Sequence, residues 1–270
     1  MKKRLLALLS VAVMIVTCFA ITGCGSSSDE KAASASSDLA YVQEKGTMVV
    51  GITDFAPMDY KDDNGEWIGF DADLARAYAE SIGVDVEFIE INWDSKEMEL
   101  ENQNIDCVWN GMTLTDGVME AMETSNAYCN NAQVVVVSKD KADSIKSAED
   151  CADLVFAVEA GSAGEEQAEA NGFNATGVET QADAVMEVAA GTADACIIDS
   201  LMAGAMVGEG TSYPDLTATV GLNEELYGVG FRKGSDMAAS LNEYLAAAYE
   251  DGTIEEIAEK YGTQESIIEQ

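Results

Sequence analysis

The feature that most restricts the fold is a strand–helix–strand pattern between residues 48 and 91. Residues 48–52 form an uninterrupted apolar run, which is typical of a buried strand. Residues 70–82 carry apolar side chains at helical spacing and stop before Gly83, and residues 84–91 alternate as a second strand does. This succession predicts a right-handed βαβ unit, and therefore an α/β protein with parallel strands.

Two stretches of the chain share a pattern that predicts two similar α/β lobes. In residues 98–111 and again in 186–199, a Met-Glu-aliphatic triplet precedes an aspartate, eight residues after the methionine, and then an apolar strand. Coincidence in a chain rich in alanine and acid is the alternative. Because ligands gather beyond the carboxyl ends of strands in such sheets, we expect a site around Gly111 and Asp199.

Later segments continue the α/β pattern. Residues 133–137 and 155–158 predict buried strands, and residues 241–249 and 254–261 predict C-terminal helices. The small-residue turn at 159–164 opens a helix, so its backbone N–H groups can face a ligand. An ordinary strand-to-helix turn is the alternative.

The N-terminus predicts export and a lipid anchor. Residues 2–4 are basic, residues 5–20 are apolar and uncharged, and a Gly-Cys junction follows at Cys24. This resembles a bacterial lipobox, with residues 1–23 as signal peptide, lipid on Cys24, and residues 24–38 as a flexible tether. An uncleaved anchor helix is the alternative, because a span needs only about 20 residues. Either way, we expect the folded part outside the cytoplasmic membrane and held at its surface.

The charge balance excludes several functions. The 270 residues contain 14 Lys plus Arg, 50 Asp plus Glu and no histidine, for a net charge of −36. Such a surface repels nucleic acid. Without histidine, Ser–His and Cys–His catalysis and histidine metal sites are absent. We therefore expect a binding protein, or an enzyme that uses carboxylates, Lys or Cys, with no cofactor and no metal.

Four cysteines follow the predicted lipidation site: Cys107, Cys129, Cys151 and Cys196. An exported protein permits disulfides, and four cysteines allow three complete pairings, among which the sequence does not choose. No CxxC motif supports a zinc or redox site. Cys107 and Cys196 lie in apolar runs, so small buried side chains are the simpler interpretation for these two.

Several blocks together resemble family 3 extracellular solute-binding proteins, the polar amino-acid receptors of ABC importers. The blocks follow the family's order, from about Leu39 to the end of the chain: Gly-Phe-Asp-x-Asp-Leu at 69–74, Gly-Met-Thr-x-Thr at 111–115, FAVEAGSAG at 156–164, GTADACIIDS at 191–200 and YGVGFRKGS at 227–235. The first two together are fairly specific, whereas either alone is weak.

The resemblance implies a type II periplasmic-binding-protein fold, with two α/β lobes joined by two hinge strands. The first lobe is then 39–128 plus 228–270 and the second is 133–222, with hinges near 128–132 and 223–227. The ligand binds in the cleft between the lobes, and bending of the hinges closes the cleft over it.

The resemblance also implies ligand-binding residues. Aromatic contacts correspond to Phe55 and Trp93, a second-lobe hydroxyl to Ser162, and the acid that pairs with an α-ammonium group to Asp199. The full expected set is Asp54, Phe55, Trp93, Asn110, Gly111, Met112, Thr113, Glu159, Ser162 and Asp199. Ordinary packing or a surface acid is the alternative for each.

One departure from the family bears on the ligand. Family members that bind amino acids carry an arginine that clamps the α-carboxylate, and Val118 stands at that position here. Glu159 adds an acid to the expected site, and none of the residues that the resemblance assigns to ligand contacts is basic. Arg76 and Arg232 lie near the predicted cleft, but no motif places them in it. The ligand is therefore either an amino acid held by backbone N–H groups, which the prevalence of such ligands in the family favours, or an amine without an α-carboxylate, which the missing arginine favours.

These observations predict a monomeric substrate-binding lipoprotein that captures a small polar solute and delivers it to an ABC permease. An enzyme on the same fold is the main alternative class, although no residue stands beside an evident base. A surface sensor is a third.

Overall fold

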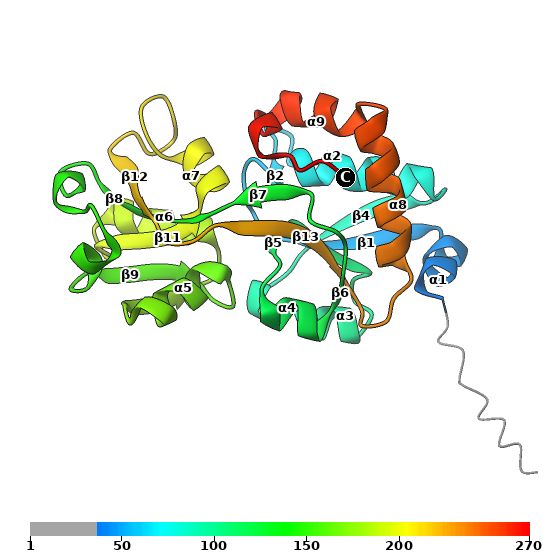
Figure 1. Ribbon diagram of the computed structural model, residues 1–270, viewed down its shortest axis with the longest axis horizontal. Coiled ribbons are helices and arrows are strands. Elements are labelled where there is room, and N and C mark those ends of the chain that lie inside the picture. Colours follow the sequence, from blue (N-terminus) through cyan, green and yellow to red (C-terminus); the bar gives the residue numbers. More distant parts are fainter. Residues whose placement is uncertain (1–36) are drawn as a thin grey trace, which may run out of the picture. The chain divides into compact units, whose positions relative to one another are not determined.

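Two β-sheets organise residues 37–270, the part of the chain that the computed structural model describes (Figure 1). The first sheet contains β1 (Thr47–Ile52), β4 (Asp85–Glu90), β5 (Cys107–Thr113), β6 (Glu123–Thr124), β7 (Cys129–Asn131) and β13 (Glu225–Phe231). The second contains β8 (Gln133–Ser138), β9 (Val155–Glu159), β10 (Asn174–Val178), β11 (Ala195–Asp199) and β12 (Leu216–Gly221). The strand orders are β4-β1-β5-β13-β6, with β7 on β13, and β10-β9-β11-β8-β12. We call each sheet with its helices the first and the second lobe.

Helices pack on both sheets. The first lobe carries α1 (Asp38–Lys45), α2 (Phe70–Ser81), α3 (Lys96–Glu101), α4 (Asp116–Ala121), α8 (Met237–Glu250) and α9 (Thr253–Tyr261). The second carries α5 (Ala163–Asn171), α6 (Gln181–Ala190) and α7 (Ser200–Met206). A small hairpin joins β2 (Tyr60–Lys61) to β3 (Trp67–Ile68), and short 3₁₀ helices occupy Trp93–Ser95, Ala142–Ser144, Ala148–Cys151 and Gln264–Ser266. Among residues 37–270, no helix is long and apolar enough to cross a membrane.

The predicted βαβ unit is confirmed. Strand β1 pairs with β4 in parallel along its whole length, and α2 connects them and packs on the sheet. Helix α2 keeps Leu74 and Tyr78 fully buried, while Arg76 between them is partly exposed. The apolar residues that recur with a 3.6-residue period in the sequence thus form the face of α2 that packs on the sheet.

The two stretches with the shared sequence pattern, residues 98–111 and 186–199, also have similar structures. Strand β5 lies parallel to β1 and antiparallel to β13, and β11 lies parallel to β9 and antiparallel to β8. The repeated aspartate has the same role in both lobes. Asp106 accepts from Val49 N–H at 2.8 Å and from a lysine at 2.5 Å, and Asp194 accepts from Val155 N–H at 3.1 Å and from another lysine at 2.6 Å. Each aspartate therefore ties the start of its strand to the neighbouring parallel strand.

The chain passes between the two sheets at two adjacent places. Strand β7 ends at Asn131 and β8 begins at Gln133, and the chain returns between β12 and β13. Strands β7 and β13 pair antiparallel, with Asn131 opposite Glu225. These crossings overlap the segments predicted as hinges, although β7 and the start of β13, inside those segments, pair within the first sheet. That these segments act as hinges stays a prediction.

The folded unit begins slightly earlier than the sequence suggests. Ser37 caps α1 and its hydroxyl donates to Asp236 at 2.5 Å, so the last two residues of the predicted tether belong to the fold. The predicted signal peptide, Cys24 and the remainder of the tether lie outside the described residues.

All four cysteines of the described part are buried and unpaired with one another: Cys107, Cys129, Cys151 and Cys196. Burial raises the pKa of every one of these thiols, which keeps them protonated and unreactive. This agrees with their interpretation as small apolar side chains and extends it from two residues to four.

Candidate functional site

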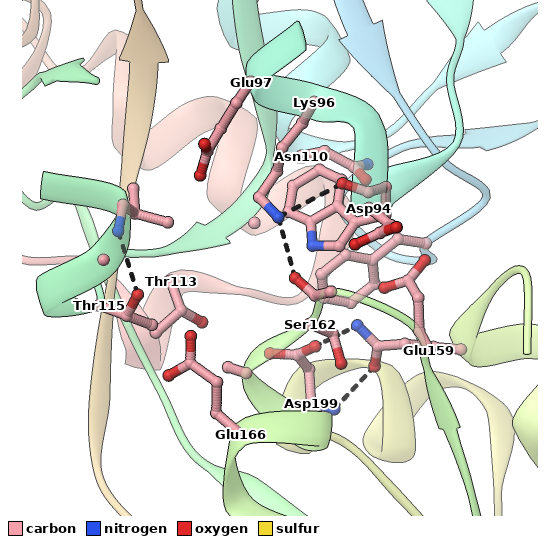
Figure 2. Close-up of a pocket in the computed structure, with 18 residues that line it drawn as sticks. Asp94, Lys96, Glu97, Asn110, Thr113, Thr115, Glu159, Ser162, Glu166 and Asp199 are labelled. Atoms are coloured by element: carbon pink, nitrogen blue, oxygen red, sulfur yellow. Dashed lines mark hydrogen bonds between the residues drawn. The ribbon is translucent and has the colours of Figure 1, made fainter. Parts of the chain in front are cut away.

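A cavity of about 320 Å³ lies between the two lobes, beyond the ends of β5, β9 and β11 (Figure 2). Its walls come from the first lobe on one side and from the start of α5, the end of β11 and the first residue of α6 on the other. This is the position expected for a ligand of an α/β sheet. The volume suits a metabolite of amino-acid size. No group of three or more metal-ligating side chains occurs among residues 37–270.

Most of the predicted residues meet at this cavity. The first lobe contributes Phe55, Trp93, Asn110, Gly111 and Thr113, and the second contributes Glu159, Ser162 and Asp199.

Two predicted residues do not line the cavity. Met112 is buried in the apolar cluster behind the cavity wall, where it packs with Leu100, Val108 and Met122. Asp54 lines a different groove, together with Glu90. Burial raises its pKa, and the negative charge of Glu90 adds to this effect.

Position 111 in β5 requires a glycine. Its backbone has φ +53°, and a Cβ there would lie 2.4 Å from Cε1 of Phe55. The absence of a side chain therefore lets the ring of Phe55 sit against the strand at the floor of the cavity. The Gly111 N–H is not free for a ligand, since it donates to buried Asp71 at 2.6 Å. Burial raises the pKa of Asp71 to about 7.

Lys96 is a cation that the sequence analysis missed. It lines the cavity from α3, and its side chain is buried. Its Nζ donates to the carbonyl oxygen of Trp93 at 3.3 Å and, across the cleft, to that of Gly161 at 2.9 Å (Figure 2). Burial lowers its pKa. The signal in the sequence was its position three residues after Trp93, one helical turn away.

The two arginines considered from the sequence lie elsewhere. Arg76 donates to the carbonyl oxygen of Trp67 and pairs with Asp73, and Arg232 pairs with Asp38. Val118 lines the cavity, and no arginine does.

Asp199 is the centre of a buried hydrogen-bond network. Its carboxylate accepts from Tyr227 at 2.6 Å, from Gln133 at 3.0 Å, and from the amides of Asn131 and Gln181. Burial, with the nearby charge of Glu225, raises its pKa, and the bonds donated by Tyr227 and Gln181 oppose that rise.

Glu225 extends this network across the two crossings of the chain. It accepts from Asn131 at 2.6 Å and from Gln133 at 2.8 Å, so the two carboxylates share both amides. It also accepts from Thr113 in the first lobe at 3.0 Å. No local pattern in the sequence indicates this network, because its members are polar residues far apart in the chain, with Thr113 and Glu225 separated by 112 positions.

Glu159, at the end of β9, has fewer hydrogen-bond partners than Asp199, and a hydrogen bond from Gln181 opposes the rise of its pKa. It is 2% exposed, and its Oε1 has no hydrogen-bond partner among the described residues. Burial, then the negative charge of Asp199, raises its pKa to about 8, against the opposing effect of Lys96.

The start of α5 supplies donors. Ser162 is the N-cap, and its hydroxyl accepts from the N–H of Glu165 at 3.2 Å. In the described part, the N–H groups of Ala163 and Gly164 have no acceptor. The positive end of the helix therefore faces the region where an anionic group of a ligand can bind.

Comparisons with known proteins agree with the fold and the site. L-cystine-binding protein TcyA of Bacillus subtilis (strain 168) is 30% identical over 268 residues, or 97% of each chain. An ABC uptake transporter substrate-binding protein from Streptococcus pneumoniae, solved with bound histidine, has a TM-score of 0.77 at 31% identity over 84% of this chain and 96% of that one. A mutant of ArgBP from T. maritima has a TM-score of 0.77 at 29% identity over 83% and 98%.

The fold is accordingly the type II periplasmic-binding-protein fold that the resemblance predicts. The sequence pattern of the family matches residues 48–264, which is most of the chain. The protein therefore belongs to the bacterial extracellular solute-binding proteins, family 3.

Proposed function

We propose that this protein is the substrate-binding component of an ABC importer and that it captures an amino acid or a related amine in the cavity between its lobes. The observation that carries the proposal is the composition of that cavity: two aromatic side chains on one lobe, Phe55 and Trp93, face helix donors and buried acids on the other. Two relatives named above bind cystine and histidine, which are compounds of this class. A lipid on Cys24 would keep the protein at the outer face of the membrane, near a permease.

The charges around the cleft favour a ligand with a positive group. Against the single cation Lys96, the cavity presents five acids: Asp94, Glu97, Glu159, Glu166 and Asp199. The groove beside it adds Asp54 and Glu90 from one lobe and Glu179 and Asp183 from the other. Bringing like charges together in a partly desolvated cleft is unfavourable, so a cationic group that neutralises them stabilises the bound form.

A carboxylate on the ligand is still compatible with the site. The unpaired N–H groups of Ala163 and Gly164 and the third proton of Lys96 can hold it without an arginine. Both ligand hypotheses therefore stand: an α-amino acid bound by helix donors, or an amine that has no carboxylate.

Calorimetry tests the proposal and separates the two hypotheses. Titrations with the common L-amino acids, L-cystine, and decarboxylated counterparts such as agmatine and cadaverine are expected to identify at least one compound that binds with a micromolar or lower Kd. Small-angle scattering with that compound at saturation should show a more compact protein. If none of these compounds binds, the proposed function is wrong; tight binding of an ordinary α-amino acid excludes the amine-only hypothesis.

Lys96→Met is expected to loosen the contact between the lobes. The hydrogen bond to Gly161 has a charged donor, and such bonds contribute about 1.5–3 kcal/mol. Without it, the ligand-free protein should have a larger radius of gyration in small-angle scattering. Lys139→Met, at an exposed position of the second lobe, is the control. An unchanged radius in Lys96→Met would show that this bond does not hold the lobes together.

A further inference from the structure

Asp71 is a buried acid without a basic partner. It is the second residue of α2, and its side chain is fully buried. No lysine or arginine of residues 37–270 lies within 4.0 Å of its carboxylate. A buried carboxylate without a counterion is costly, and a neutral side chain would avoid that cost. Such a local conflict close to a ligand cavity indicates a function for the acid.

The carboxylate of Asp71 connects the floor of the cavity to the first crossing, the passage of the chain from β7 to β8. Its Oδ2 accepts from the Gly111 N–H at 2.6 Å, and the Tyr128 hydroxyl donates to the carboxylate, 2.8 Å from each oxygen. Gly111 lines the cavity and packs against the ring of Phe55. Tyr128 is the residue directly before β7. One buried group therefore binds both the floor and the start of the crossing.

Tyr128 is held at each of its polar groups. Its N–H donates to the carbonyl oxygen of Tyr227 at 3.0 Å, and its own carbonyl oxygen accepts from the N–H of Ile268 at 3.0 Å. Its hydroxyl donates to Asp71, and its ring stacks on Phe70 with 6.1 Å between the centroids. The chain is therefore fixed at Tyr128, directly before it crosses to the second sheet.

A second buried acid, Asp59, is connected to the cavity in a similar way. Its Oδ2 accepts from the side-chain amide of Asn110, a cavity residue, at 2.8 Å. The Asp71 N–H donates to the carbonyl oxygen of Met58 at 3.0 Å, which holds the start of α2 against this segment. Burial, then the negative charge of Asp71, raises the pKa of Asp59 well above its ordinary value. Asp59 therefore keeps its proton, and above pH 7 the charge lies on Asp71, where more donors stabilise it.

We infer that Asp71 is a positioning residue of the binding cavity, which through its hydrogen bonds to Gly111 and Tyr128 fixes the cavity floor relative to the start of the first crossing. Asp71 does not line the cavity, so it acts through these two residues. The inference rests on the proposed function, because it assumes that the cavity binds a solute. A floor that is already ordered loses less conformational entropy on binding, so removing the connection should weaken the binding of different solutes by a similar factor.

Tyr128→Phe tests the connection, and Tyr78→Phe is its matched control. Each variant removes one hydroxyl from a fully buried tyrosine of the first lobe, and neither tyrosine lines the cavity. The Tyr128 hydroxyl donates to Asp71, whereas that of Tyr78 donates to Ser240 on α8 at 3.0 Å. Calorimetry at pH 8 with the common L-amino acids, L-cystine, agmatine and cadaverine measures affinity. Nuclear magnetic resonance of the ligand-free protein measures the exchange rate and the chemical shift of the Gly111 amide proton.

The charge of Asp71 gives a second readout that a loss of packing would not change. Burial raises its pKa to about 7, and the hydrogen bond from Tyr128 opposes this rise. The Gly111 amide signal should therefore titrate with a midpoint near pH 7 in the wild type, at a higher pH in Tyr128→Phe, and not at all in Asp71→Asn. The other titratable groups around the two acids are Asp73, Arg76, Cys107, Tyr128 and Cys129.

For each compound that binds the wild type, Tyr128→Phe should lower the affinity about 3- to 10-fold and speed the exchange of the Gly111 amide about tenfold, whereas Tyr78→Phe should leave both unchanged. Equal affinity in wild type and Tyr128→Phe, or an equal loss in Tyr78→Phe, would overturn the inference while leaving the proposed function intact. A Gly111 signal that does not titrate anywhere between pH 4 and pH 9 in the wild type would overturn it too. If none of the compounds binds the wild type, the proposed function fails, and the inference fails with it. A thermal melt of each variant establishes that the protein is folded.

Discussion

Asp199→Ala is expected to lower the free energy of unfolding by about 3–5 kcal/mol. The substitution removes the shared acceptor of a buried network, and it leaves donors of Tyr227, Gln133, Asn131 and Gln181 without that partner. Breaking a buried charged network from one side typically has a cost of this size, since each unpaired group keeps its desolvation penalty. Urea unfolding of the ligand-free protein at pH 7, followed by tryptophan fluorescence, measures the change.

Two further variants show whether the loss of stability in Asp199→Ala comes from the lost acceptor. Asp199→Asn retains one carbonyl oxygen as acceptor, so its loss of stability should be clearly smaller than that of the alanine variant. Asp215→Ala makes the same substitution at an exposed position of the second lobe and should change stability by less than about 0.5 kcal/mol. If Asp199→Ala were as stable as Asp215→Ala, the network would not contribute to the fold.

The elements that the sequence predicts well are those whose signal is local. The βαβ unit of β1, α2 and β4 follows from apolar periodicity and a stop at glycine. The repeated spacing before β5 and β11 reflects a local requirement too, because Asp106 and Asp194 each bind the adjacent parallel strand at the same place. For this reason the lobes and the general position of the cleft were accessible from sequence.

The site was accessible only in part. Strand-end positions such as Gly111 and Ser162 follow from motif and topology arguments. Which neighbouring side chain faces the cavity depends on tertiary packing, and Met112 is buried among apolar side chains instead. Lys96 escaped because a basic residue in an acidic helix is ordinarily exposed, and only the packed second lobe makes it buried.

The sequence also does not predict that the two buried acids of the second lobe have different hydrogen-bond partners. Asp199 and Glu159 both end buried strands, and nothing local distinguishes them. What distinguishes them is the set of amides and the tyrosine that the crossing segments bring to Asp199 alone. The hydrogen-bond partners of a buried acid depend on tertiary packing, so no local pattern predicts them.

The last prediction concerns stability and pH in the ligand-free protein. Glu159 has a pKa of about 8 in the fold, compared with its ordinary value of 4.5. Below pH 4.5 the group is protonated in both the folded and the unfolded chain. As the pH rises from 4.5 to 8, the unfolded chain loses this proton and the folded one keeps it, so the group's contribution to stability falls. The loss is complete above pH 8.

Glu159→Gln should therefore be less stable than the wild type by about 1–2 kcal/mol at pH 5, where only the unpaired glutamine amide acts, and more stable than the wild type at pH 9. A shift of this size corresponds to at most about 5 kcal/mol, and the unpaired glutamine amide offsets part of it, so we expect a gain of about 3–4 kcal/mol at pH 9. Urea unfolding at pH 5, 7 and 9 measures it, with Glu169→Gln as control for net charge. The difference between the two curves reports the titration of Glu159 together with its electrostatic effect on neighbouring Asp199. A difference that does not grow with pH would mean that the Glu159 carboxylate is as well stabilised in the folded protein as in the unfolded chain, and that its pKa is not raised.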